Sequence, residues 1–164
     1  MTPPTGNRRP ILAGFFRRLA VLRRCPASPP PGTRRGAVSL AGLAPQIRED
    51  LATGRKESDT WRLLYGFADD FRGSSTEGKR WLIGDEPALT GRRGLDAALA
   101  GMAEFFAGEA GLPVPAWVNG ESRVAVPWYF VASSTWQHAY VLARTPAAFK
   151  AHGVFIAREV FDRA

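Results

Sequence analysis

The sequence predicts an all-α protein, a compact orthogonal bundle of about six helices preceded by a disordered N-terminal tail. Three observations predict this class. Apolar residues recur at helical spacing after residue 37, typical start and stop residues separate the apolar stripes, and no segment alternates convincingly as a strand does. The chain has 164 residues, 45% of them hydrophobic, which is enough for one domain with its own core.

The segment 1–37 differs in composition from the rest of the chain. It holds eight arginines and no acidic residue, and it is rich in proline and glycine, so it cannot fill a core. From residue 38 onward fourteen Lys and Arg face fifteen Asp and Glu, which places all of the net charge of +7 in the tail. We therefore expect a disordered tail over 1–37 and an α-helical domain over 38–164. A second interpretation is a mis-assigned start, with translation beginning at Val38.

The basic tail also allows an interaction with nucleic acid. Its apolar residues between 11 and 22 can form one side of a short helix, with arginines opposite, as suits an anionic surface. The domain itself is nearly neutral, so any contact with phosphates is expected through the tail alone. The candidate nucleic-acid contacts are Arg8, Arg9, Arg17, Arg18, Arg23 and Arg24.

The expected helices follow from caps and apolar stripes. Starts are predicted near Ala44 with Pro45 in the first turn, at Ser58–Asp59, at a capping box of Ser74 and Glu77, at residue 92, at a capping box of Ser134 and Gln137, and at Thr145 with Pro146 as the first helical residue. The segment 92–110 has the strongest apolar stripe and is expected to be the central helix. Residues 124–126 or 154–156 are the only candidates for brief strand pairing.

The C-terminal stretch "TPAAFKAHGVFI", residues 145–156, combines a helix start, a stop and one histidine. We expect Phe149 to project into the core and Gly153 to end the helix so that Phe155 can pack. His152 falls in the last turn, where the helix dipole favours an imidazole, so we interpret it as structural.

No catalytic or metal-binding constellation is evident. The two histidines, His138 and His152, have no second ligand at zinc spacing, and the acidic pairs at 69–70 and 85–86 are interpreted as solvated. Glu104, beside the central apolar stripe, is expected to pair with an arginine. Walker, dinucleotide-binding and nucleophile-elbow motifs are missing from the sequence. We therefore expect a non-enzymatic protein with no cofactor and no metal.

The second half of the domain is dense in aromatic residues. Most are expected in the core, and any that stay exposed would mark a protein-binding patch, because rigid aromatic rings dominate interface energetics. The candidate partner-binding residues are Trp117, Trp128, Tyr129, Phe130 and Trp136. Core packing remains the alternative for each of them. One cysteine, Cys25, and the lack of a long apolar run favour a cytoplasmic protein that does not span a membrane.

Four sequence blocks in a fixed order resemble one domain family. They are "GLDAALAGMAE" (94–104), "AGLPVPAWV" (110–118), "PWYF" (127–130) and "TPAAFKAHGVFI" (145–156). The chain is similar to an uncharacterised α-helical domain common in actinobacteria, found alone or behind an XRE-type helix-turn-helix and often encoded beside a nucleotidyltransferase-like toxin gene. Two features depart from that family: Leu95 replaces a usual tryptophan, and no helix-turn-helix precedes the domain.

The resemblance implies an antitoxin or regulatory partner that binds another protein, namely a nucleotidyltransferase-type toxin. It carries no catalytic motif and identifies no contact residues. A nucleic-acid-associated transcriptional regulator that uses the basic tail remains the alternative. The sequence does not indicate an oligomeric state.

Overall fold

The computed structural model describes residues 28–131 and 134–162. Its helices are α1 (Leu40–Ala52), α2 (Glu57–Arg72), α3 (Thr76–Gly84), α4 (Arg93–Glu109), α5 (Gln137–Arg144) and α6 (Ala147–Ala151). Short 3₁₀ turns are η1 (Ala116–Asn119), η2 (Glu121–Arg123) and η3 (Arg158–Val160). Two strands of two residues each, β1 (Tyr129–Phe130) and β2 (Val154–Phe155), are the described extended elements. The predicted all-α class is confirmed.

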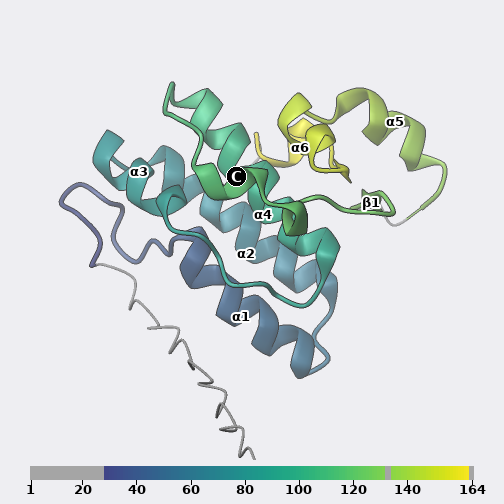
Figure 1. Cartoon of the computed structure of the whole chain (residues 1–164), viewed down its shortest axis with the longest axis horizontal. Coiled ribbons are helices and arrows are strands. Elements are labelled where there is room, and N and C mark those ends of the chain that lie inside the picture. Colours follow the sequence, from purple (N-terminus) through teal and green to yellow (C-terminus); the bar gives the residue numbers. More distant parts are fainter. Residues whose placement is uncertain (1–27, 132–133, 163–164) are drawn as a thin grey trace, which may run out of the picture.

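The helices form two groups that share one core (Figure 1). Helices α1, α2 and α3 contact one another, while α4 carries α6, η1, η2 and β2 against its other sides. Aromatic rings join the groups: the centroids of Phe71 in α2 and Phe106 in α4 lie 5.1 Å apart. Phe161, which stacks on Phe149 of α6 at 5.4 Å, also lies 6.1 Å from Tyr65 of α2. Helix α5 lies at the edge of the molecule.

Helix α4 is the central helix that the apolar stripe predicted over 92–110. Twelve of its 17 residues are buried, because neighbours cover it on most of its circumference. Two glycines permit the closest approaches: a Cβ on Gly94 would lie 2.6 Å from the ring of Tyr129, and one on Gly101 would lie 2.7 Å from the ring of Phe149. Substituting either glycine would therefore push a neighbouring ring out of place.

Helix α1 begins earlier than the sequence predicted. The start was expected near Ala44, with Pro45 in the first turn, but the helix begins at Leu40 and holds Pro45 in its interior. The side chain of Ser39 caps it by accepting a hydrogen bond from the backbone N–H of Gly42 at 3.2 Å. This cap and the complete burial of Leu40 outweigh the one backbone bond that the proline removes.

The predicted caps of α3 and α6 were wrong by one residue. Ser75, not Ser74, caps α3 by accepting from Gly78 N, because the Ser74 hydroxyl is engaged with the carbonyl of Asp70. Pro146, not Thr145, is the N-cap residue of α6. The Thr145 hydroxyl instead donates to the carbonyl of Val141 and accepts from a backbone N–H in the last part of the chain.

The starts of α2 and α5 also differ slightly from their predicted caps. Lys56 is the N-cap residue of α2 and gives no side-chain bond, so the expected Ser58–Asp59 cap lies inside the helix. At α5 the N-cap residue is Trp136. The Ser134 hydroxyl donates to the Gln137 side-chain oxygen at 2.9 Å, so the two residues interact, but not through the reciprocal backbone bonds of a capping box.

Strands β1 and β2 form a parallel pair in which Tyr129 lies opposite Val154 and Phe130 opposite Phe155. Pairing at 154–156 was one of the two sequence alternatives, whereas its partner segment was not foreseen. Ala125, four residues before β1, adds a hydrogen bond from its backbone N–H to the carbonyl of His152 at 2.9 Å. Gly153 ends α6 as predicted, with a φ of +68° that favours glycine.

The last residues of the predicted tail, 28–37, contact α3. The backbone N–H of Ser75 donates to the Gly32 carbonyl at 2.8 Å, and the N–H of Arg34 donates to the Ser74 hydroxyl at 3.0 Å. The Arg34 side chain lies 3.6 Å from the carboxylate of Asp70. Residues 1–27 lie outside the described part of the chain, and so do the six arginines proposed to contact nucleic acid.

Candidate functional site

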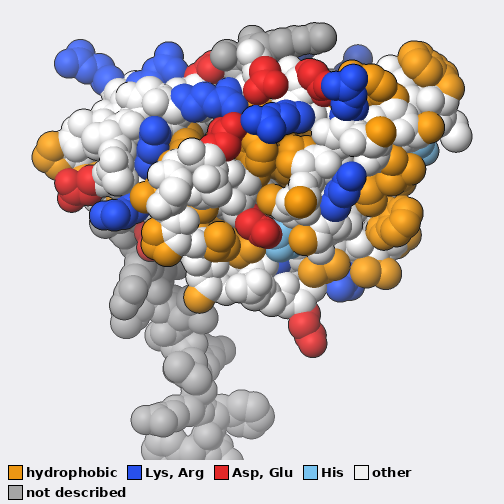
Figure 2. Space-filling model, turned by 90° about the horizontal axis from the view of Figure 1, so that it is seen from above, with side chains coloured by type: hydrophobic (Ala, Val, Ile, Leu, Met, Phe, Trp, Pro, Cys, Tyr) orange, Lys and Arg blue, Asp and Glu red, His pale blue; other side chains and the backbone are white. Residues whose placement is uncertain are grey.

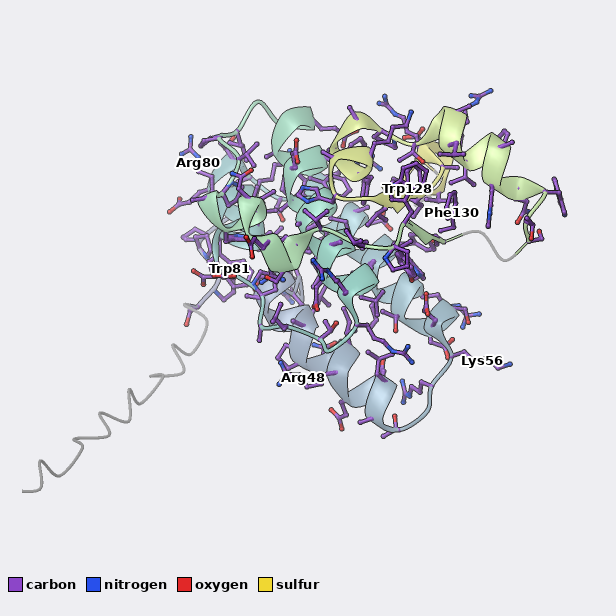
Figure 3. The ribbon with its side chains drawn as sticks, turned by 45° about the vertical axis from the view of Figure 1, so that its right-hand side comes forward. Arg48, Lys56, Arg80, Trp81, Trp128 and Phe130 are labelled. Carbon is purple, nitrogen blue, oxygen red and sulfur yellow. The ribbon has the colours of Figure 1, made fainter. Side chains whose placement is uncertain are left out.

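Six hydrophobic side chains in the segments around β1 and α5 are exposed or partly exposed, and this set is here called the aromatic surface. Its members are Val126, Trp128, Phe130, Trp136, Tyr140 and Leu142. Trp128 is 65% exposed and Trp136 is 78% exposed, both high values for the largest apolar side chain. Figure 2 shows hydrophobic side chains gathered at this end of the molecule, and Figure 3 shows Trp128 and Phe130 side by side. Such a face is typical of interaction sites.

The strand pair holds the first part of the aromatic surface in place. The backbone N–H groups of Tyr129 and Val131 donate to β2 and its preceding glycine, which fixes the segment between them. Phe155 of β2 then supports two rings: its centroid lies 5.0 Å from that of Trp128 and 4.8 Å from that of Phe130. Phe130 in turn stacks on His138 at 4.1 Å. These contacts restrict the rings before any partner binds, which lowers the entropy cost of binding.

Helix α5 presents the second part. Val141 is its one buried residue, so most of the helix faces away from the core. Trp136 and Tyr140 are four residues apart and therefore lie on one side of the helix. The Arg144 guanidinium lies 5.6 Å from the centroid of the Tyr140 ring and 2.9 Å from the carboxylate of Glu159. These contacts hold Tyr140 at the edge of the surface.

Two of the five sequence candidates lie elsewhere and have structural contacts. Trp117 is partly buried, donates its indole N–H to the Ile83 carbonyl at 3.1 Å, and lies under the Arg123 guanidinium at 5.1 Å. Tyr129 packs on the core beside Gly94 and accepts a hydrogen bond from the indole N–H of Trp61 at 3.2 Å. The structure thus brings Trp128 and Phe130 together on Phe155, places Trp136 at the start of α5, and gives Trp117 and Tyr129 structural contacts elsewhere.

The ionisation of Tyr129 reflects this burial. Its hydroxyl also bonds to the carboxylate of Glu57. Burial, and then the bond to Glu57, raise the pKa of Tyr129 well above the ordinary value of 10.0. The Tyr129 hydroxyl therefore stays protonated at neutral pH and serves as a link between α2 and β1.

Three members of the aromatic surface were missed by the sequence candidates: Val126, Tyr140 and Leu142. Tyr140 and Leu142 could have been found from the helical spacing of α5, because they flank Val141 on opposite sides and only one side of so short a helix can face the core. Val126 gives no such signal. It lies in the irregular segment between η2 and β1 and is 68% exposed.

The titratable residues near α4 form a structural network. Glu104 was expected to pair with an arginine, but its carboxylate lies 2.9 Å from Nε2 of His152. The other ring nitrogen, Nδ1, donates to the Arg123 carbonyl at 2.8 Å. Both ring nitrogens of the buried His152 are thus engaged within the protein, which agrees with its structural interpretation. No local pattern predicts this contact, because the two side chains lie 48 positions apart.

The Arg123 side chain is only 1% exposed, although it carries a charge. It bonds to the Glu86 carboxylate at 3.1 Å and to the Pro87 carbonyl, while its Nε and Nη1 atoms have no hydrogen-bond partner among the described residues. The ring of Trp117 faces the guanidinium and partly replaces those bonds. The Glu86 side chain is 61% exposed, so it is solvated as the sequence interpretation expected, and it also forms an ion pair with Arg123.

Basic side chains of the described domain are spread over its surface. Figure 3 shows Arg48, Lys56 and Arg80 on three separate parts of the molecule, and they belong to α1, the N-cap of α2 and α3 respectively. Arg48 is engaged with the Leu89 carbonyl at 2.6 Å. A dispersed arrangement of this kind does not resemble the continuous basic stripe of nucleic-acid-binding domains.

Within residues 28–131 and 134–162, no group of three or more His, Cys, Asp or Glu side chains is arranged to hold a metal ion. The helices of the same part of the chain are each too short or too polar to cross a membrane. A scan against protein-family models, a search of curated proteins and a search of solved structures each found no match to this chain.

Proposed function

We propose that this chain is a non-enzymatic protein-binding domain and that its aromatic surface is the contact region. The observation that carries the proposal is the exposure of two tryptophans, Trp128 beside β1 and Trp136 at the start of α5. Tryptophan is among the residues most enriched in binding hot spots, and leaving two of them in water is unfavourable unless a partner covers them. The rings of Trp128 and Phe130 are already restricted by Phe155, so a partner would meet a part of the surface that needs little ordering.

The partner that we propose is a nucleotidyltransferase-type toxin, which would make the chain a cytoplasmic antitoxin. Support comes from the order and spacing of the four sequence blocks described above. An antitoxin of this kind acts by covering the surface of another protein, which needs exposed anchor residues rather than a catalytic group. The aromatic surface supplies such anchors.

The proposal is tested by bacterial growth. We expect that inducing the adjacent gene alone arrests growth and that co-expressing this chain restores it. Trp128→Ala and Trp136→Ala should each weaken the complex by about 30-fold or more, as for a hot-spot residue worth about 2 kcal/mol. Leu89→Ala is the matched control, because Leu89 is also an exposed apolar residue, at 49%, but lies outside the aromatic surface.

Two results would contradict the proposal. The first is a neighbouring gene that is harmless or whose toxicity the chain does not change. The second is an equal loss of rescue for Leu89→Ala and the two tryptophan variants, which would separate binding from the aromatic surface. Circular dichroism of each variant must show an unchanged fold, as expected for exposed positions.

The alternative function is a nucleic-acid-associated transcriptional regulator that uses the basic tail. The eight arginines of residues 1–37 favour it, since the remainder of the chain has a net charge of −1. DNA binding that falls steeply between about 50 and 200 mM salt and disappears on deletion of residues 1–37 would support this function. Full-length protein that shows no salt-dependent binding would exclude it.

A further inference from the structure

Residues 30–37 form two successive turns beside α3 (Figure 1). In the first turn the backbone N–H of Thr33 donates to the Pro30 carbonyl at 3.2 Å, with Pro31–Gly32 as the central pair. The glycine has a φ of +81°, as the second central residue of a type II turn requires. A second turn follows over 34–37, again with a glycine of positive φ, +82°, at that position. The segment therefore has the residues that its turns need.

The first turn contacts the N-terminal end of α3. The N-cap residue Ser75 donates its backbone N–H to the Gly32 carbonyl at 2.8 Å and its hydroxyl to the Pro31 carbonyl at 3.4 Å. The backbone N–H of Arg34 donates to the Ser74 hydroxyl at 3.0 Å. The N–H groups at the start of a helix have no partner within the helix, so their acceptors must come from elsewhere. Here the turn supplies one of them.

Gly78 explains why α3 needs an acceptor from outside the helix. In a capping box the side chain at the third helical position, N3, bonds to the backbone N–H of the N-cap residue. Gly78 occupies N3 and has no side chain, and the Gly32 carbonyl accepts that N–H instead. A Cβ on Gly78 would lie 2.9 Å from the Thr33 hydroxyl oxygen and 3.0 Å from the Thr33 Cα. The same glycine thus leaves a donor unpaired and leaves room for the segment that pairs it.

The contact continues along the connection between α2 and α3. A Cβ on Gly73 would lie 3.3 Å from Cδ of Arg34, and the Arg34 Nε lies 3.6 Å from the Asp70 carboxylate. The Arg34 side chain is 51% exposed, so this ion pair contributes little. Ser74 is only 7% exposed, and the bond that it accepts from Arg34 is shielded from water. The backbone bonds and the close contacts at the glycines are therefore the main attachment.

We infer that residues 30–34 are a strap that caps α3 from outside the helix, and that the folded domain begins near residue 30. A chain that began at Val38, the second interpretation of the sequence, would lack this strap. The six arginines proposed to contact nucleic acid all precede residue 28. Deletion of residues 1–27 would therefore remove them and keep the strap, which separates a function of the tail from the stability of the domain.

Thermal unfolding of the full-length chain, followed by circular dichroism, tests the strap. The added methyl group of Gly78→Ala would overlap the Thr33 backbone, so the midpoint should fall by about 2–4 °C, although alanine favours a helix more than glycine does. Gly84→Ala is the matched control, because Gly84 belongs to the same helix and has open space around its Cβ position. That variant should not lower the midpoint. A midpoint for Gly78→Ala as high as that for Gly84→Ala would overturn the inference.

A second set of variants shows whether the loss comes from the strap. A Gly–Ser linker of equal length replaces residues 30–34 in the full-length chain, which removes the strap and keeps the tail. The linker should lower the midpoint by at least as much as Gly78→Ala does, and adding Gly78→Ala to it should cause no further fall. A linker that leaves the midpoint unchanged would overturn the inference. An equal loss for Gly78→Ala with and without the strap would do so too, because its cause would then lie within α3.

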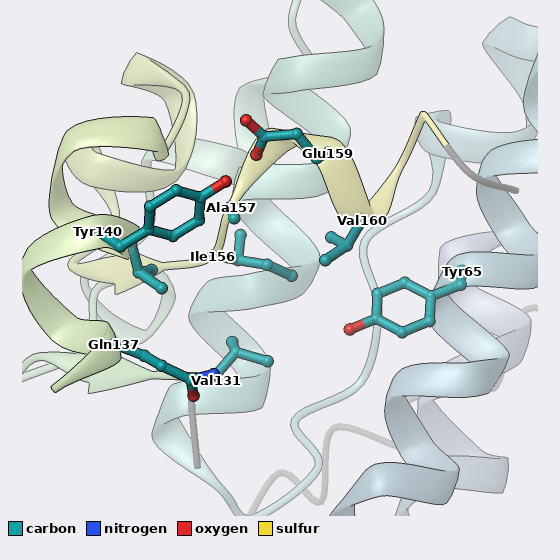
Figure 4. Close-up of a pocket in the computed structure, with 9 residues that line it drawn as sticks. Tyr65, Val131, Gln137, Tyr140, Ile156, Ala157, Glu159 and Val160 are labelled. Atoms are coloured by element: carbon teal, nitrogen blue, oxygen red, sulfur yellow. The ribbon is translucent and has the colours of Figure 1, made fainter. Parts of the chain in front are cut away.

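Amide hydrogen exchange of the full-length chain tests the capping bond itself. The Ser75 N–H should exchange at least about tenfold faster in the linker variant, because it loses its acceptor. Val131 and Ile156 line the cavity between α2, α5 and η3 (Figure 4), and their N–H groups bond to Phe155 and Thr145. They serve as a reference and should keep their exchange rates. An unchanged rate for Ser75 would overturn the capping role.

Gly32→Ala keeps the test decisive if Gly78→Ala does not fold. A Cβ on Gly32 would lie 2.8 Å from Oγ of Ser75, in addition to the strain of its positive φ. Gly54→Ala is the control, because Gly54 has a φ of +72° and open space around its Cβ position. Both variants strain the backbone, but only Gly32→Ala also disturbs the contact with α3, so its midpoint should fall further. Equal midpoints would contradict the strap.

Discussion

Replacing Gly101 with alanine tests the packing of α6 on the central helix. The added Cβ would lie 2.7 Å from Cδ1 of the Phe149 ring, whereas carbon atoms in good contact are about 3.5–4.0 Å apart. Phe149 is completely buried and stacks on Phe161, so its ring cannot turn away into solvent. The strain must therefore be relieved by moving α6 away from α4.

The magnitude follows from two opposing effects. Overpacking in a core costs about 1–3 kcal/mol, while alanine gains about 1 kcal/mol over glycine in a helix interior. Gly101→Ala should thus lower the free energy of unfolding by about 1 kcal/mol, within a range of about 0–2 kcal/mol. Gly66→Ala is the matched control, because Gly66 lies in α2 with open space around its Cβ position. That variant should gain about 1 kcal/mol.

Urea unfolding of the full-length chain, followed by far-UV circular dichroism, measures both variants. We expect the two midpoints to move in opposite directions at unchanged slope, with free energies of unfolding that differ by about 2 kcal/mol. If Gly101→Ala gains as much stability as Gly66→Ala, then Phe149 does not pack against α4 as described, and the explanation given for the glycine is refuted.

Variants at three further residues probe buried polar groups. Burial raises the folded-state pKa of Tyr129 above 10.0, so the protonated hydroxyl contributes its full stabilisation below pH 10 and loses it as the pH rises further. Tyr129→Phe should therefore make the fall in the free energy of unfolding at alkaline pH shallower. The same substitution leaves the Trp61 N–H unpaired and should cost about 1 kcal/mol at pH 7. His152→Ala should cost about 2–3 kcal/mol in urea unfolding, because it leaves the Arg123 carbonyl and the Glu104 carboxylate without their partner, and His152→Gln should cost less. Arg123→Met should change the midpoint of thermal unfolding little, since an apolar chain of similar length replaces a buried cation with two unpaired nitrogens. Arg123→Ala should cost about 2–4 kcal/mol of unfolding free energy, because it leaves a cavity. A large loss for Arg123→Met would show that its ion pair with Glu86 is required for folding.

Local sequence patterns predicted the helices that are defined by residues close together in the chain. The continuous apolar stripe located α4 to within one residue at each end, and Gly73 and Gly153 marked the ends of α2 and α6. Caps were less certain, because neighbouring hydroxyl residues compete for the same role. Ser74 and Ser75 are both suitable caps for α3, and the contact of Ser74 with Asp70 and Arg34 decides between them.

The aromatic candidates could be named from the sequence but not divided into buried and exposed. Trp117 and Trp128 lie in sequence segments of similar composition. Trp117 is partly buried by its contacts with the Ile83 carbonyl and Arg123, whereas Trp128 lies on Phe155 with most of its area exposed to water. Such partners are distant in the chain, so no local pattern reports them. The pairing of His152 with Glu104 in place of an arginine has the same cause.

The segment that carries α5 is hydrogen-bonded at both of its ends, Val131 and Thr145, to two residues that are neighbours in the chain, Phe155 and Ile156. Val131 N donates to the Phe155 carbonyl at 3.1 Å, and Ile156 N donates to the Thr145 hydroxyl at 3.1 Å, so positions 155 and 156 close the base of a loop. A compact loop with a closed base can change its sequence or length with little cost to the domain beneath it. Variation in α5 could thus give related chains different partners on an unchanged scaffold, with recognition and folding evolving independently of each other.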